Sequence, residues 1–160
     1  LVMKNVLITR IDDRLIHGQV VTAWIKVYPI NKILIIDDEL SKNKLMTRIY
    51  RAAAPAGVEV ILKGLDDALH YLHEEPEKGE NVMILVKVPE IIEAIIDSGF
   101  TVNKVILGGM GASEKRKRFN RNISASESEI ESFRRIVEKG IEIVYQLVPN
   151  DREMNIRDLL

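Results

Sequence analysis

The sequence contains no cysteine, few aromatic residues (5%) and almost no net charge (−1 at pH 7). Without cysteine the chain forms neither disulfides nor thiolate metal sites, which fits a reducing cytoplasm. The near-zero charge gives no overall field that would attract nucleic acid. No uncharged apolar run approaches the ~20 residues that a membrane-spanning helix needs, and the N-terminus lacks the apolar segment of a signal peptide. We therefore expect a cytoplasmic protein that binds no nucleic acid.

The length and composition indicate one domain. A chain of 160 residues, 46% of them hydrophobic and 29% charged, can bury a substantial core. No repeat, low-complexity linker or shift in composition divides it. We predict a single domain over residues 1–160, with Leu1 and Val2 preceding a natural start at Met3.

Short β-branched runs alternate with longer amphipathic stretches along the chain. The predicted strands are 5–9, 32–37, 58–62, 82–87, 104–108 and 141–148. Most of these runs are continuously apolar, which is typical of parallel strands covered on both faces. The alternation predicts a doubly wound, three-layer α/β domain around a mostly parallel sheet of about six or seven strands.

The helices are predicted from apolar periodicity and from residues that favour helix ends. The predicted helices are 17–28, 41–54, 66–73, 89–98 and 126–139, with Ser41 as an N-cap. Within 108–125, the segment "RNIS" is expected to form a short extra strand in a hairpin-like return. The tail is expected to form a short helix that docks through Met154, Ile156 and Leu159.

Ligands of an open α/β sheet gather where the strands end, at their carboxyl edge. Asp37 and Asp38 follow the second strand, Lys87 follows the fourth, and Gly109 and Met110 follow the fifth. We expect these residues to line one rim, with Met110 as a contact for partners. The loop after the first strand, "TRIDDRLIHGQV" (9–20), is richer in chemistry than any of them.

His17 stands in that loop, where a helix is predicted to begin. A neutral imidazole is nucleophilic and can accept or relay a phosphoryl group or a proton. The helix start places backbone N–H groups nearby, so Gly18 and Gln19 are expected to contact a phosphate, with Gly18 permitting close approach.

Four charged residues precede the histidine. Arg10 and Arg14 could hold a dianion with their planar guanidinium groups. Asp12 or Asp13 could accept a hydrogen bond from one ring nitrogen and leave the other as the nucleophile. The competing interpretation is that these residues only pair with one another while the histidine caps the helix. The position at the rim of the sheet favours a functional site.

Other segments carry weaker signals. "GGMG" (108–111) lacks the full dinucleotide and P-loop fingerprints, so it predicts no nucleotide. The basic segment 114–121 is either a solvated loop or a surface that contacts a partner. His70 and His73, three residues apart, are expected to lie at a solvated helix end rather than bind a metal. Trp24 and Tyr28 are expected in the core.

The string "RIDDRLIHGQV" resembles the active-site loop of the enzyme IIB components of the mannose/fructose/sorbose class of the bacterial sugar phosphotransferase system. The segments "IIDDE", "LVKVPE" and "VILGGMG" are similar to segments at corresponding places in that family, so the resemblance covers the full chain. It implies an α/β fold that agrees with the alternation described above.

The resemblance implies a phosphohistidine–sugar phosphotransferase without metal or cofactor. His17 would accept a phosphoryl group on Nδ1 from a phosphorylated IIA protein or domain, with Arg14 assisting, while Arg10, Asp12 and Asp13 match the rest of the loop. The group would then pass to a sugar presented by the IIC and IID membrane components, which would hold this protein at the inner face of the membrane. A homodimer and the identity of the sugar stay open.

Two alternatives remain on the residues themselves. One is a non-catalytic α/β domain that binds a phosphorylated metabolite through the same loop. The other is an enzyme with His17 as a general base, although no second carboxylate or nucleophile motif demands a substrate pocket beside it.

Overall fold

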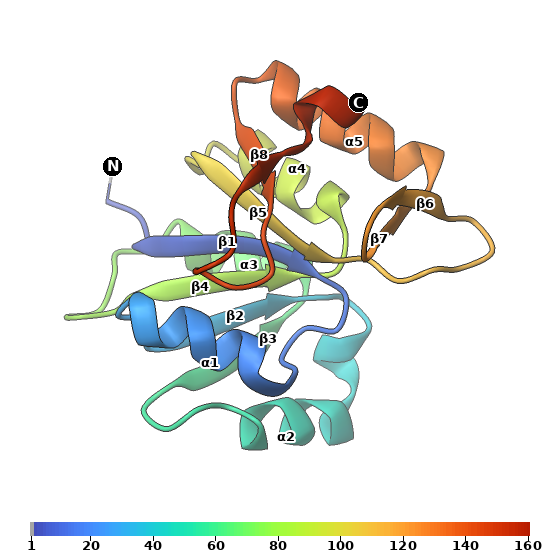
Figure 1. The fold of residues 1–160 in the computed structure, drawn as a ribbon. Coiled ribbons are helices and arrows are strands. Elements are labelled where there is room, and N and C mark those ends of the chain that lie inside the picture. Colours follow the sequence, from blue (N-terminus) through green and yellow to red (C-terminus); the bar gives the residue numbers. More distant parts are fainter. Residues whose placement is uncertain (1) are drawn as a thin grey trace.

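The computed structural model describes residues 2–160, so the prediction about Leu1 lies outside the described residues. A seven-stranded sheet forms the centre of the molecule (Figure 1). Its strand order is β3-β2-β4-β1-β5-β8-β9, and only β9 runs antiparallel. The strands are β1 (Val6–Asp12), β2 (Lys32–Ile36), β3 (Glu59–Lys63), β4 (Val82–Val86), β5 (Lys104–Gly109), β8 (Glu142–Tyr145) and β9 (Met154–Asn155).

Helices cover both faces of this sheet. The helices are α1 (Gly18–Val27), α2 (Lys44–Ala52), α3 (Leu65–Leu72), α4 (Pro89–Asp97) and α5 (Glu127–Glu138), with short 3-10 helices η1 (Leu40–Lys42) and η2 (Ile156–Leu159). One hydrophobic cluster joins α3, α4 and α5 to one face of the sheet, and a second joins α1 and α2 to the other. The predicted three-layer doubly wound class is confirmed.

Continuous burial explains why the strands could be predicted from their sequence. Every residue of β4 is buried, and so are four of the five residues of β2. Such strands need apolar side chains on both faces, which produces the uninterrupted Val, Ile and Leu runs. Strand β1 extends further than predicted, to Asp12, because its last residues pair with β5.

Local residues explain where two of the helices begin, whereas the one predicted N-cap was misplaced. Pro89 occupies the first turn of α4, and Ser126 caps α5 in a capping box with Glu129. The prediction of Ser41 as an N-cap was wrong. Residue 41 lies in η1, and the side chain of Asn43 instead accepts a hydrogen bond from the Met46 N–H.

Towards the C-terminus, one segment agrees with the expected pattern and one differs from it. The predicted extra strand exists as β7 (Ile123–Ala125), which pairs with β6 (Lys117–Asn120) in an antiparallel hairpin. The tail forms β9 and η2 rather than a helix alone. Ile156 is fully buried, but Leu159 is exposed, so its predicted docking was wrong.

Among residues 2–160, no helix combines the length and the apolar character that crossing a bilayer requires.

Candidate functional site

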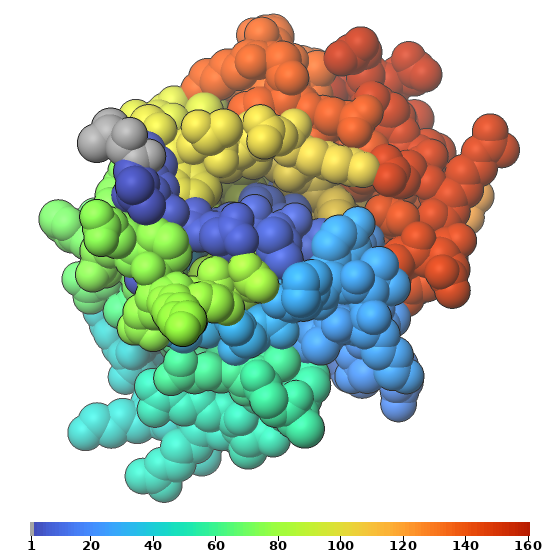
Figure 2. Space-filling view, turned by 90° about the vertical axis from the view of Figure 1, so that its left-hand side faces the viewer, coloured from blue at the N-terminus to red at the C-terminus, as the bar shows by residue number. Residues whose placement is uncertain are grey.

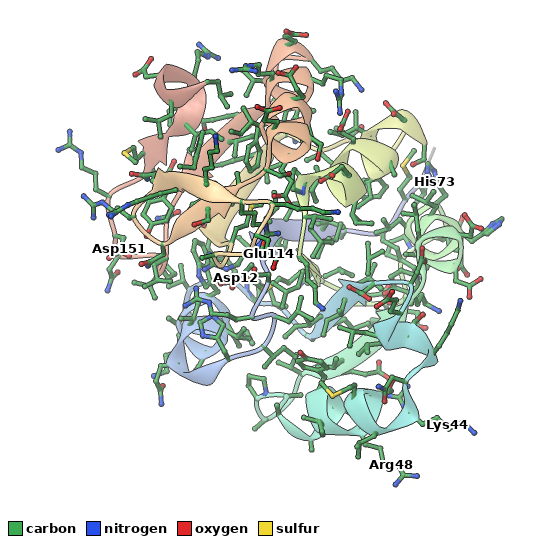
Figure 3. All side chains as sticks on the ribbon, turned by 90° about the vertical axis from the view of Figure 1, so that its right-hand side faces the viewer. Asp12, Lys44, Arg48, His73, Glu114 and Asp151 are labelled. Atoms are coloured by element: carbon green, nitrogen blue, oxygen red, sulfur yellow. The ribbon has the colours of Figure 1, made fainter. Side chains whose placement is uncertain are left out.

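The carboxyl end of β1 holds a buried carboxylate surrounded by cations. Asp12, the last residue of β1, is fully buried and faces the centre of the rim (Figure 3). Its oxygens accept hydrogen bonds from Arg14 Nε at 2.9 Å, Arg14 Nη2 at 3.0 Å and Arg10 Nη2 at 3.3 Å. His17 Nε2 lies 3.2 Å from Asp12 Oδ2. One carboxylate therefore connects all three basic side chains of the loop.

Asp12 is held in its ionised form despite its burial. Burial by itself would raise the pKa of Asp12, but hydrogen bonds from Arg14 and the charges of both arginines lower it below the ordinary value. An ionised carboxylate can only accept hydrogen bonds, so Nε2 of His17 must donate to it. In a neutral ring the single N–H proton is then on Nε2 and the lone pair is on Nδ1. Of the two aspartates, Asp12 is therefore the one that orients His17.

Arg10 lies beneath the site and does not reach its surface. Its side chain is 1% exposed, its Nη1 donates to the Gln146 carbonyl at 2.9 Å, and its guanidinium lies 5.4 Å from the Trp24 ring centroid. Burial lowers the pKa of Arg10. The expectation that Arg10 holds a dianion directly was wrong, because its guanidinium points into the protein, where it balances Asp12.

Arg14 and His17 are the parts of this network that reach solvent. The Arg14 side chain is 42% exposed and that of His17 25% exposed. The hydrogen bonds to Asp12 raise the pKa of Arg14, so its charge is secure. With Arg10 and Arg14 against one carboxylate, the cluster carries one excess positive charge beside an imidazole with a free lone pair. Such a cluster can receive an anion at its exposed side.

The loop backbone is fixed by unusual torsion angles. Leu15 has φ of 57° and Gly18 has φ of 48°, both in the left-handed region. Leu15 is buried in the core beside α1, which holds the strained residue in place. A Cβ at Gly18 would meet no neighbouring atom. The glycine is therefore required by its φ angle rather than by close packing, and it and Gln19 lie exposed at the start of α1.

Two glycines at the end of β5 make room for the arginines. A Cβ at Gly108 would overlap the Arg10 guanidinium, and one at Gly109 would lie 2.7 Å from Arg14 Nη2. Close approach of the two arginines therefore explains why both of these residues are glycine. The sequence signal was present, but its partner could not be identified without the β1–β5 pairing.

Asp13 has a separate role from Asp12. Its Oδ2 accepts hydrogen bonds from the Gly111 N–H at 2.7 Å and from Arg116 Nη1 at 2.9 Å. Arg116 also forms two hydrogen bonds to Glu129, the residue that completes the cap of α5. Arg116 therefore ties the His17 loop to α5. Sequence reasoning missed this residue, because nothing distinguished it within the basic segment 114–121.

The remaining predicted rim residues do not join the cluster. Asp37 Oδ2 lies 3.7 Å from Lys87 Nζ, and Asp38 Oδ1 accepts a hydrogen bond from the Leu65 N–H; within residues 2–160, no side-chain hydrogen bond or ion pair joins either aspartate to the His17 loop. Met110 was predicted to contact partners, which was wrong: it is 1% exposed and packs in the core against β7.

The other sequence signals have structural roles. Trp24 is buried, as predicted, and its Nε1 donates to the Leu147 carbonyl at 3.0 Å. Tyr28 stacks on Trp24 but is exposed, so its placement in the core was wrong. His73 lies near Ser98 at 3.0 Å, and the described part of the chain contains no group of three or more His, Cys, Asp or Glu arranged around a metal.

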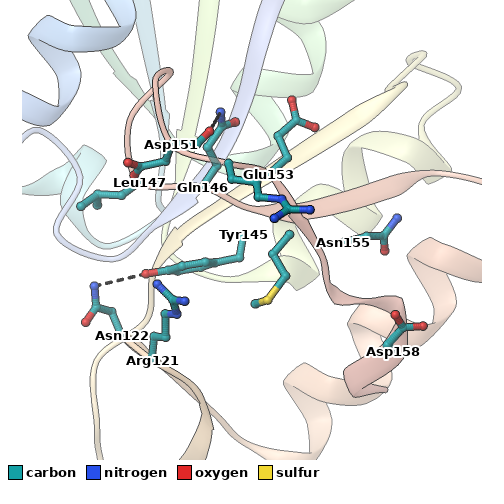
Figure 4. A pocket seen from close by; sticks show the side chains of 11 residues that line it. Arg121, Asn122, Tyr145, Gln146, Leu147, Asp151, Glu153, Asn155 and Asp158 are labelled. Atoms are coloured by element: carbon teal, nitrogen blue, oxygen red, sulfur yellow. Dashed lines mark hydrogen bonds between the residues drawn. The ribbon is translucent and has the colours of Figure 1, made fainter.

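A cavity of about 790 Å³ lies at the end of β8, close to the back of the Arg10 site (Figure 4). Tyr145 lies across it, and the Tyr145 hydroxyl accepts a hydrogen bond from Asn122 Nδ2 at 3.3 Å. Arg121 reaches into it from the hairpin turn. His17 and Arg14 do not line this cavity. The imidazole, with its side chain 25% exposed, is reached from solvent and not through this cavity, which suits contact with another protein better than enclosure of a small substrate.

Comparison with known proteins agrees with this geometry. The model of the family "PTS system sorbose subfamily IIB component" matches residues 6–160. The fructose-specific EIIB component of Bacillus subtilis is 27% identical over 99% of this chain and 97% of its own length. The mannose-specific EIIAB component of Escherichia coli K12 is 30% identical over 96% of this chain, which spans 47% of that protein.

A solved structure gives the same result for the fold. The IIBSor domain of the sorbose permease from Klebsiella pneumoniae superposes with a TM-score of 0.92 at 30% identity, covering 97% of this chain and 95% of that one. With the family model matching almost the whole sequence, the chain belongs to the sorbose subfamily of IIB components of the sugar phosphotransferase system.

Proposed function

We propose that this IIB component carries a phosphoryl group on Nδ1 of His17. The group comes from a phosphohistidine of a IIA protein or domain and passes to a sugar held by IIC and IID components at the inner face of the membrane. The observation that carries the proposal is the Nε2–Asp12 contact of 3.2 Å, which engages Nε2 and leaves Nδ1 as the nitrogen available for nucleophilic attack.

The two transfers balance without a metal or cofactor. First, the Nδ1 lone pair attacks phosphorus and the bond from phosphorus to the donor histidine breaks, with the electron pair returning to the donor ring. The ring of His17 then carries a positive charge, which the ionised Asp12 stabilises through Nε2–H. Next, a sugar hydroxyl attacks phosphorus and the bond to Nδ1 breaks, with its electron pair returning to the His17 ring, which becomes neutral again. The hydroxyl proton passes to water or to a base of the membrane component that holds the sugar.

Arg14 is the side chain best placed to contact the phosphoryl oxygens during both transfers. It is exposed, permanently charged and attached at the same carboxylate as the ring. Transfer in both directions requires the phosphoryl group to be positioned without being bound tightly. An arginine shared with Asp12 meets that requirement, because its interaction with the phosphoryl group competes with an existing pair.

Relatives supply the partner classes. The mannose-specific relative is named an EIIAB component, and this chain spans about half of it, which supports a IIA protein as the donor. Relatives are named for fructose, mannose and sorbose, so the acceptor sugar stays open.

Intact-mass measurement after incubation with phosphoenolpyruvate and the general phosphotransferase proteins with IIA tests the proposal. We expect one acid-labile phosphate on the wild type, none on His17→Ala, and normal labelling of His73→Ala as the matched control. Full labelling of His17→Ala would overturn the assignment. Reversible phosphate binding without covalent mass would favour a metabolite-binding domain instead.

A further inference from the structure

Helix α2 carries an exposed surface that the phosphoryl carrier function does not use. Residues 40–58 contain four basic residues and no acidic one, although the whole chain has a net charge of −1. The basic residues are Lys42, Lys44, Arg48 and Arg51. All four are exposed, and none forms an ion pair within residues 2–160.

The outer face of α2 has two parallel rows. Lys44, Arg48 and Arg51 follow one another at spacings of four and three residues, so they form one row along the helix. Leu45 and Ile49 form the neighbouring row and are 64% and 48% exposed. Charge and apolar area therefore face outward together, whereas the opposite face of the helix is half-buried.

This surface lies at the edge of the molecule. In Figure 3 the side chains of Lys44 and Arg48 point outward at the periphery, away from Asp12. Figure 2 shows the molecule from the opposite side, and there the segment of α2, coloured cyan, protrudes at the lower left. Helix α2 follows η1, which comes shortly after the carboxyl end of β2, and it lies to one side of the sheet (Figure 1).

We propose that the outer face of α2 binds the surface of an anionic lipid bilayer directly. Lipid phosphates would pair with the row of cations, while Leu45 and Ile49 enter the boundary between headgroups and acyl chains. A bilayer fits better than an acidic protein surface, because the apolar row is flanked by cations and lies on a protruding helix rather than in a groove. The inference goes beyond the proposed phosphoryl transfer and does not depend on it.

Such binding would be weak and reversible. Each basic residue near an anionic membrane strengthens binding roughly fivefold, so a few cations and two apolar side chains give only a modest affinity. Weak binding to the bilayer would raise the local concentration of the carrier near its membrane partners. Because the binding is reversible, it would not prevent the carrier from leaving the membrane. The attraction between exposed charges and lipid should also fall with increasing salt.

Co-sedimentation of the full chain with vesicles tests the proposal. Phosphatidylcholine vesicles containing about a third of phosphatidylglycerol should bind the protein at low salt, and vesicles of phosphatidylcholine alone should not. The double variant Lys44→Glu/Arg48→Glu should weaken binding by more than about tenfold, since it removes two attractive charges and adds two repulsive ones. Lys115→Glu/Lys117→Glu makes the same change in charge on exposed residues outside α2 and is the matched control.

The apolar row has its own matched pair. Leu45→Ser/Ile49→Ser should weaken binding severalfold, whereas Val27→Ser/Leu159→Ser, which alters two exposed apolar residues elsewhere, should not. Equal binding to neutral and anionic vesicles, or equal loss in the test and control variants, would overturn the proposal. All variants should keep their fold by circular dichroism and still accept phosphate on His17; loss of labelling without loss of vesicle binding would affect only the proposed carrier function.

Discussion

Two carboxylates are buried among cations at opposite ends of the same sheet, and the two networks differ in what they leave exposed. At the carboxyl end, Asp12 binds Arg10, Arg14 and His17. At the amino end, Glu80 contacts Lys4 Nζ at 2.8 Å, Lys32 Nζ at 2.5 Å and the Tyr71 hydroxyl at 2.8 Å. Each network centres on one buried carboxylate with two cations and one polar ring around it, and Lys32 Nζ also lies 3.2 Å from the exposed carboxylate of Glu77.

The Glu80 network is closed. Figure 2, which faces the amino ends of the strands, shows the dark blue N-terminal segment lying against the green segment around residue 80. Lys4 and Glu80 are almost fully buried, and Lys32 is mostly buried. Burial would raise the pKa of Glu80, but hydrogen bonds from Lys32, Lys4 and Tyr71 lower it to about 2. Lys4, Lys32 and Tyr71 all donate to this carboxylate, so the network holds together four segments of chain, those around residues 4, 32, 71 and 80.

The Asp12 network is half open. Arg10 is as buried as Lys4, but Arg14 and His17 turn one side to solvent. A carrier site needs that open side, because the phosphoryl group must arrive and leave. The comparison indicates that the same type of ion cluster can either stabilise the fold or form a reactive site. Which of the two it does depends on which of its side chains stay accessible to solvent.

Replacement of Asp12 should give the largest effect, because it removes the carboxylate at the centre of the half-open network. Asp12→Asn leaves Arg10 buried beside a neutral group and no longer fixes the proton on Nε2 of His17. We expect the free energy of unfolding to fall by about 3 kcal/mol or more and phosphoryl transfer to slow by a factor on the order of 10² or more. Denaturant unfolding and rapid-quench labelling measure the two effects; unchanged transfer would mean that His17 does not need Asp12 to orient its ring.

Acid should act on the Glu80 network over a defined range of pH. The folded-state pKa of about 2 lies below the ordinary value of 4.5, so the stabilisation is complete above about pH 4.5 and is lost as pH falls towards 2. A difference of that size corresponds to about 3 kcal/mol. Unfolding free energies measured between pH 6 and pH 2 should fall over this range in the wild type. An unfolding free energy that does not change between pH 6 and pH 2 would contradict the stabilisation assigned to the Glu80 network.

Glu80→Gln should sharpen the contrast by affecting stability alone. The amide keeps the shape of the side chain but leaves the buried Lys4 without its counter-charge, while Lys32 keeps only the exposed carboxylates of Glu77 and Glu59. We expect the free energy of unfolding to fall by about 2 kcal/mol, with the acid dependence reduced and labelling of His17 normal. Slower labelling at equal folded fraction would mean that the two ends of the sheet are coupled.

Arg14→Gln should show the smallest effect on stability. Because Arg14 is 42% exposed, its pair with Asp12 is partly screened, and we expect a loss of less than about 1 kcal/mol. Transfer from IIA to His17 should slow by about tenfold, since a charge near the phosphoryl oxygens is removed. Lys32→Gln is the matched change in the other network and should reverse the pattern, with lower stability and unchanged transfer.

The fold could be predicted further than the site. Buried parallel strands must be apolar on both faces, so runs such as Lys32–Ile36 and Val82–Val86 identify themselves. Capping at Ser126 and the proline at the start of α4 are equally local signals. The prediction of Ser41 as an N-cap was wrong because several residues in that segment can cap a helix, and only packing selects Asn43.

Within the site, the sequence alone determined the chemistry that is available: a histidine at a helix start, two arginines and two aspartates after a first strand, and a pair of glycines after a later one. Tertiary structure decided which of these residues takes which role. Pairing of β1 with β5 buries Arg10 under Gly108 and directs Asp12 to His17, while Arg116 takes Asp13 away to α5. These outcomes depend on contacts between residues about a hundred positions apart, and burial rather than residue type decides which charges stay accessible.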